Sequence, residues 1–204
     1  MCAATIETLT SPSSDQQDLA VNETIYIAYY FFEGGGTKRS SVIDMIRCLI
    51  LQLSRYFEKL PTIITEFYDR FASDQTLKAE PSETECFDVL VGLLDLNDHT
   101  FLIIDAIDES NEKDLDELLS ALTRISQHNP AQVRIICTSR PLRSIQDKVS
   151  HDVWKTVSLD SENTNEDIKL YIENALQVDS VLMGIDKAFK ARISPLIVRS
   201  ANGM

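Results

Sequence analysis

The sequence predicts an α/β protein with an open parallel sheet and crossover helices. Short runs of apolar and β-branched residues alternate with longer segments in which apolar residues recur every three or four positions. This alternation is typical of parallel sheets, because a helix returns the chain to the start of the next strand. The chain has 204 residues, of which 44% are hydrophobic and 25% charged, so it can bury a sizeable core.

The first 60 residues are expected to hold a short helix, a strand and a long helix. Residues 2–9 are compatible with a helix, and a polar stretch follows to about residue 20. Residues 25–32 (IYIAYYFF) are aromatic and β-branched and therefore predict a strand. From Ser40 the apolar residues adopt a helical spacing. That stripe consists of Val42, Met45, Ile46, Leu49, Ile50, Leu53 and Phe57.

Two further helices are predicted before the second strand. Pro61 suits the first turn of a helix. The apolar face of that helix consists of Ile63, Ile64, Phe67, Tyr68 and Phe71. Ser82 and Glu85 match a capping box, in which each side chain bonds the backbone of the other residue. This signature precedes an apolar helix that reaches about Leu94.

The second strand is predicted at residues 101–104 (FLII). Four consecutive large apolar residues are typical of a strand buried on both faces in the middle of a parallel sheet. A helix is expected from about Lys113 to Gln127, and another short strand over residues 133–138. A helix to about Val149 and a possible strand from Val153 to Leu159 follow.

The last 40 residues are predicted to be helical. Thr164 and Asp167 match a second capping box, ahead of a helical stripe that begins at Ile168. The remaining chain to Met204 is expected to be helical as well.

Composition excludes several classes of partner. The formal net charge of −13 argues against nucleic-acid binding, which depends on Lys and Arg, and against an anionic membrane surface. No apolar run approaches the roughly 20 residues that span a bilayer. The scattered cysteines (Cys2, Cys48, Cys86 and Cys137) are expected to be buried free thiols in a reducing compartment. The expected location is cytoplasmic.

Three carboxylates, Asp105, Asp108 and Glu109, follow the apolar run of the second strand. Open α/β sheets bind ligands at the carboxyl ends of their strands, and carboxylates there can hold a divalent cation that bridges phosphate oxygens. The alternative is a solvated acidic turn at the end of the strand. The pattern alone leaves these two interpretations equally supported.

Arg140 follows the third strand and is a second candidate. An arginine at this position can reach a terminal phosphate, but it can also simply be an exposed residue at the end of a strand. The phosphate cradle G-x-x-x-x-G-K-[ST] is absent from the sequence. Gly34–Gly36 with Lys38 comes nearest to it but is too short. We interpret it as a loop in which Ser40 or Ser41 caps the long helix.

These pieces together are similar to a known family. The sequence resembles the NACHT-type, nephrocystin-like N-terminal domain of STAND-class P-loop NTPases, in the version common in multidomain fungal proteins. The matching segments are residues 28–32, 38–53, 101–109, 138–141, 165–168 and 201–204. The combination of an acidic strand end with a later T-S-R-P is the most specific of these features.

The resemblance implies a P-loop NTPase-like core that uses Mg²⁺ with ATP or GTP. Asp105 would be the Walker B aspartate that holds magnesium. Asp108 and Glu109 would position or activate the attacking water, and Arg140 would sense the terminal phosphate. The resemblance also implies signalling through a nucleotide-dependent switch, with a homo-oligomer or other protein partners engaged by flanking repeat domains.

The family's first strand and Walker A motif have no counterpart in the sequence. We therefore expect residues 1–20 to be the helix after that motif plus a polar loop, residues 21–160 the α/β core, and residues 161–204 a truncated helical part. The absent strand would leave a gap beside the Walker B strand. The expected function is an incomplete nucleotide-binding module that binds nucleotide weakly or not at all. The alternative is a non-catalytic fragment that docks onto an intact partner.

Overall fold

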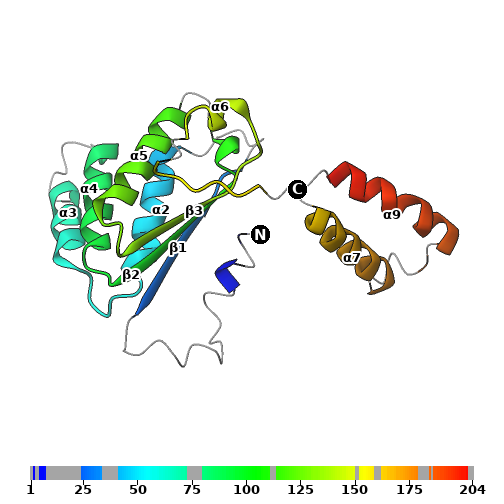
Figure 1. Ribbon diagram of the computed structural model, residues 1–204. Coiled ribbons are helices and arrows are strands. Elements are labelled where there is room, and N and C mark those ends of the chain that lie inside the picture. The colour runs from blue at the N-terminus through cyan, green and yellow to red at the C-terminus, as the bar shows by residue number, and fades with distance from the viewer. Residues whose placement is uncertain are drawn as a thin grey trace. The chain divides into compact units, whose positions relative to one another are not determined.

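The chain forms two compact units, Met1–Val153 and Trp154–Met204. The computed structural model describes residues 2, 5–7, 24–33, 41–72, 80–110, 114–149, 152–158, 162–178, 184 and 186–201 (Figure 1). The glycine loop at positions 34–36 and Lys38 lie outside the described residues.

The first unit contains the sheet and its crossover helices. Its elements, in chain order, are β1 (Ile25–Phe31), α2 (Val42–Ser54), α3 (Thr62–Ala72), α4 (Glu83–Leu94), β2 (His99–Asp105), the 3-10 turn η2 (Ile107–Glu109), α5 (Leu115–His128), β3 (Val133–Cys137) and α6 (Arg143–Gln146). The prediction of an open parallel α/β sheet with flanking helices is confirmed.

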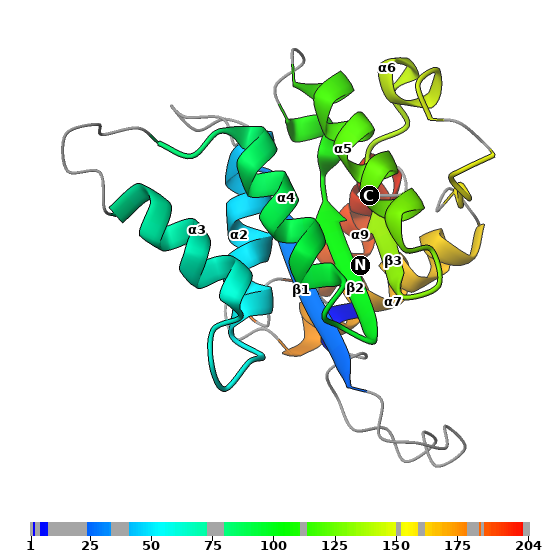
Figure 2. The same cartoon turned by 90° about the vertical axis from the view of Figure 1, so that its left-hand side faces the viewer.

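The described strands form one parallel sheet in the order β1-β2-β3. Helices α2 to α5 lie on one side of the sheet (Figures 1 and 2). Residues Cys2 and Ile6 of the short N-terminal helix pack against the other face, on Ile27 and Ile103. The middle strand is therefore buried from both sides, and Leu102, Ile103 and Ile104 are all 0% exposed.

The sheet has no gap beside β2, so that expectation is wrong. Ile103 pairs with Tyr29 on one side and with Ile136 on the other. The direct ladder between β2 and β3 satisfies the backbone groups that an unpaired strand would leave exposed. Strand β3 itself occupies the position beside β2 that the expectation left empty.

Local signals at the helix starts behave as the sequence predicts. Ser41 is the N-cap of α2, and its side chain and backbone form a capping box with Asp44. Ser82 and Glu85 form the same arrangement at the start of α4. The predicted stripe of α2 is largely confirmed by its buried residues, which are Val42, Met45, Ile46, Leu49 and Leu53.

Three local predictions differ from the structure. Residues 153–158 form no strand, because no neighbouring strand pairs with them in the described sheet, and Leu159 lies outside the described residues. In the second unit, α7 (Glu162–Val178) begins before Thr164, which is therefore not an N-cap. Tyr68, predicted on the apolar face of α3, is 69% exposed.

The second unit is helical, as predicted. It consists of α7 and α9 (Lys187–Ala201). Ile172 and Leu176 of α7 are buried, and Lys190 of α9 donates to the carbonyl oxygen of Leu176 at 2.7 Å. Among the helices in the described part of the chain, none is both long and apolar enough to cross a membrane.

Candidate functional site

The acidic end of β2 turns sharply at Ala106. This residue has left-handed backbone angles, φ 54° and ψ 51°, a conformation that costs an L-residue about 1–2 kcal/mol. Two hydrogen bonds hold it. The Ala106 N–H donates to Thr138 Oγ1 at 3.0 Å, and the Ala106 carbonyl accepts from the Glu109 N–H at 2.9 Å. The turn directs residues 107–109 into η2, which carries two of the three carboxylates.

The ladder between β2 and β3 continues beyond the ends of both strands. The Thr138 N–H donates to the Ile104 carbonyl, and the Thr138 carbonyl accepts from the Ile107 N–H, both at 3.0 Å. This register places the segment after β3 beside the carboxylates after β2. The two predicted elements of the site, separated by some thirty residues in sequence, are thereby brought together.

Asp105 is half-buried and is held by Thr138. The Thr138 hydroxyl donates to Asp105 Oδ1 and lies 4.0 Å from Cys2 Sγ. Burial, followed by the hydrogen bond and the negative charge of Asp105, raises the pKa of the Cys2 thiol to about 11. Cys2 is therefore a protonated, poorly nucleophilic thiol at neutral pH.

Asp108 and Glu109 hold Arg140. The Asp108 side chain is only 3% exposed; its Oδ1 accepts from the Arg140 backbone N–H at 3.1 Å and its Oδ2 from Arg140 Nε. Arg140 Nη2 also donates to Glu109 Oε1 at 3.3 Å. The hydrogen bond and charge of Asp108, and then the charge of Glu109, raise the pKa of Arg140. The guanidinium thus offsets the charge of a buried carboxylate, which would otherwise be costly.

Most of the chain matches the model of a known protein family. The model of the family described as Nephrocystin 3, N-terminal matches residues 1–140. The chain belongs to this family. Searches of curated proteins and of solved structures found no match. All four predicted site residues lie within the part of the chain matched to the nephrocystin 3 N-terminal family.

In this nephrocystin-type domain, all four predicted residues gather at one edge of the sheet, and each has a protein partner. Asp105 accepts from Thr138, while Asp108 and Glu109 share Arg140. Within the described residues, no three His, Cys, Asp or Glu side chains form a group that could hold a metal ion. The cluster therefore offers one half-buried carboxylate, Asp105, beside two carboxylates that share a single guanidinium.

Sequence reasoning missed the role of Thr138. Its hydroxyl connects the Ala106 backbone to the Asp105 carboxylate. Only the register of β2 with β3 reveals this, because Thr138 has no special spacing from Asp105 in the sequence. The T-S-R-P segment predicts a functional role for Arg140 alone.

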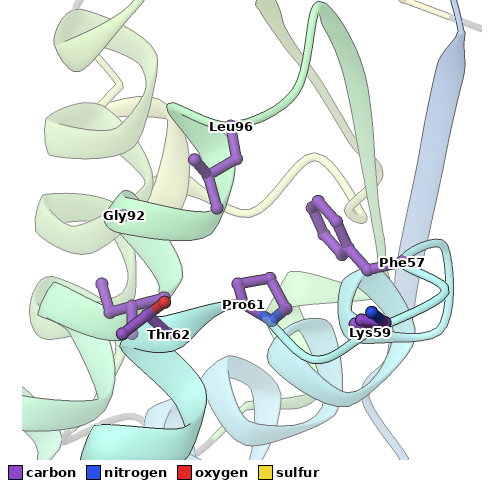
Figure 3. Close-up of a pocket in the computed structure, with 7 residues that line it drawn as sticks. Phe57, Lys59, Pro61, Thr62, Gly92 and Leu96 are labelled. Carbon is purple, nitrogen blue, oxygen red and sulfur yellow. The ribbon is translucent and has the colours of Figure 1, made fainter.

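The domain also has an apolar hollow that is separate from this cluster. It is lined by Phe57, Lys59, Pro61, Thr62, Ile63, Gly92 and Leu96, and its volume is about 480 Å³ (Figure 3). Gly92 permits the close approach of α3 there, because a Cβ at that position would lie 2.1 Å from Ile63 Cδ1. None of the lining residues belongs to the acidic cluster.

Proposed function

We propose that the chain is an incomplete nucleotide-binding module of the NACHT and STAND type, from a signalling or self/non-self recognition protein. The observation that supports this proposal is the convergence of Asp105, Asp108, Glu109 and Arg140 at the carboxyl edge of a parallel sheet. Ligands bind at this edge in open α/β folds.

The donor set suits magnesium bound with a nucleotide. Mg²⁺ is usually held by one or two carboxylates together with phosphate oxygens and water, and rarely by a cage of protein ligands alone. Asp105 supplies one such carboxylate, and Thr138 fixes its orientation. A bound Mg²⁺ would neutralise phosphate charge. The single carboxylate therefore fits Mg²⁺ presented by ATP or GTP better than it fits the free ion.

The other three residues would act on the terminal phosphate and on water. Arg140 is 55% exposed along its side chain, so its guanidinium is accessible to a phosphate. An Arg140 side chain that turns to a phosphate would release Glu109 and the Oδ2 atom of Asp108, while Asp108 Oδ1 keeps its bond to the Arg140 backbone N–H. The released oxygens could then orient a water molecule. The ion pair and the phosphate compete for one guanidinium, which makes the acid–arginine pair responsive to the nucleotide.

Binding is expected to be weak for this chain alone. The sequence contains no G-x-x-x-x-G-K-[ST], whose backbone N–H groups and lysine hold the phosphates in P-loop proteins. Asp105 and Arg140 contact only the metal and the outer phosphate in this proposal. The affinity is therefore expected to be weaker than micromolar.

The test is a titration of isotope-labelled protein with Mg-ATP and Mg-GTP, followed by amide chemical shifts. We expect shifts confined to residues 105–109 and 138–140 at millimolar nucleotide, dependent on Mg²⁺ and lost in Asp105→Asn. Asp88→Asn, which changes an exposed aspartate on α4, is the matched control. No shifts in the parent protein would contradict the metal–nucleotide role, and micromolar affinity would contradict the expected weakness.

A second candidate function is a non-catalytic module that docks onto an intact protein of the same family. The observation that favours it is that Asp108 and Glu109 already share the guanidinium of Arg140 without any ligand. Sedimentation of this chain mixed with a purified intact member would show a complex under this alternative. Independent sedimentation of the two proteins, together with the nucleotide-dependent shifts above, would exclude it.

A further inference from the structure

The outer edge of β1 is closed by two side chains. Strand β1 is the first strand in the sheet order, so only one of its edges faces β2. The backbone N–H of Phe32, directly after β1, donates to the Asp105 carbonyl and therefore points toward β2. Backbone groups alternate in direction along a strand in a parallel sheet, so Ile27 and Tyr29 direct theirs away from β2. An edge of this kind is a template for pairing with another chain.

Tyr56 and Gln52 occupy these outward groups. The Tyr56 hydroxyl accepts from the Ile27 N–H at 3.1 Å and donates to the Ile27 carbonyl at 3.2 Å. Gln52 Oε1 accepts from the Tyr29 N–H at 3.1 Å, and Nε2 donates to the Tyr29 carbonyl at 2.7 Å. Each side chain thus makes the donor and acceptor pair that a residue of a neighbouring strand would make.

The spacing explains why the end of α2 and the turn after it, in which the Tyr56 N–H donates to the Leu53 carbonyl, can substitute for a strand here. Positions four apart on a helix are separated by about 6 Å along its axis. Positions two apart on a strand are separated by about 6.6 Å. Gln52 and Tyr56 differ by four positions and Tyr29 and Ile27 by two, in opposite chain directions. The two repeats therefore match.

Two further contacts fix the orientation of these side chains. Gln52 Nε2 also donates to Cys48 Sγ at 3.2 Å. The side-chain amide can therefore make its hydrogen bonds to Tyr29 and Cys48 together in one orientation only. The Tyr56 ring packs edge-on against Tyr26, with ring centroids 5.1 Å apart. Gln52 lies in α2 and Tyr56 lies in the turn that follows the helix, and α2 lies beside β1 (Figure 2).

We infer that Gln52 and Tyr56 act as a side-chain strand that closes the β1 edge against strand addition by another chain. The edge is otherwise accessible, because Tyr29 is 39% and Tyr56 45% exposed. The parent protein is protected at the two central outward positions of β1. The aromatic and β-branched sequence of β1, which favours pairing, makes this protection necessary.

The test uses the full chain with Gln52→Met and Tyr56→Phe, singly and together, since both changes keep the shape and remove the hydrogen-bonding atoms. Amide hydrogen exchange and sedimentation velocity are measured. In the double variant we expect exchange at Ile27 and Tyr29 to be about tenfold faster, as follows from losing roughly one net hydrogen bond each. We also expect larger concentration-dependent oligomers than the parent forms. Gln146→Met and Tyr68→Phe, which change exposed side chains, are the controls.

Amides of Ala28 and Tyr30 face β2 and report whether the sheet remains folded. Unchanged exchange at Ile27 and Tyr29 would overturn the inference. Faster exchange without increased association would overturn the blocking role, because the bonds would then only join α2 to β1. If the double variant does not fold, Tyr56→Phe alone decides by the same two measurements.

Discussion

Ile103→Ala tests whether the middle strand is buried on both faces. Ile103 is 0% exposed and packs against Cys2 and Ile27 on the face opposite α2. The substitution removes three carbon atoms, worth about 2.4 kcal/mol at roughly 0.8 kcal/mol per buried methylene. A residual cavity adds to this, so the expected loss is about 3–4 kcal/mol. This is a large fraction of the roughly 5–15 kcal/mol that stabilises a typical domain.

The loss is measured by urea unfolding, followed by far-UV circular dichroism. Ile104→Ala, which is equally buried but points to the other face, is expected to cost a similar amount. Leu51→Ala, at a position 54% exposed on α2, is the surface control and should cost well under 1 kcal/mol. A loss below about 1 kcal/mol for Ile103→Ala alone, with an unchanged slope, would show that Cys2 and Ile6 do not cover this face.

Three further predictions concern local interactions. Ser82→Ala removes the N-cap of α4 and should lower the free energy of unfolding by about 1 kcal/mol in urea unfolding; an unchanged midpoint would contradict the capping role. Burial and the nearby Glu117 charge raise the pKa of Glu83, so its ionised form opposes folding. Stability from this group is present below the ordinary carboxyl pKa and lost as pH rises through the raised value. Glu83→Gln should therefore stabilise the protein at pH 7 but not at pH 3, and equal effects at both pH values would refute this. The Cys2 pKa of about 11 predicts slow iodoacetamide alkylation in native protein at pH 8; mass spectrometry that finds Cys2 modified as fast as in urea would contradict its burial.

Local sequence patterns predicted the elements that depend on near neighbours. Ser82 and Glu85 lie three residues apart, and their mutual bonds need only a helix start. The FLII run identified β2 because four large apolar residues in succession require cover on both faces. The convergence of Asp105 and Arg140 followed from strand order, since carboxyl ends of parallel strands meet at one edge.

Interactions that depend on register were not predictable. The Thr138 hydroxyl reaches Asp105 because Cys137 pairs with Ile104, and nothing in the sequence fixes that alignment. The absence of a gap beside β2 has the same origin. Residues 153–158 have a strand-like composition, but composition cannot supply the neighbour with which a strand must pair.

The sheet register also bears on the order of folding. In the β1–β2 ladder, Ile25 pairs with His99, a separation of 74 residues (from position 25 to position 99), whereas Thr100 pairs with Val133, a separation of 33 (from position 100 to position 133). Closing the longer loop costs about 0.7 kcal/mol more in chain entropy. The β2–β3 pair should therefore form first and β1 join later. Until then both edges of β1 are open. Tyr29 is only 23 positions from Gln52, and Ile27 only 29 positions from Tyr56, so these contacts can form early enough to protect one of the two edges.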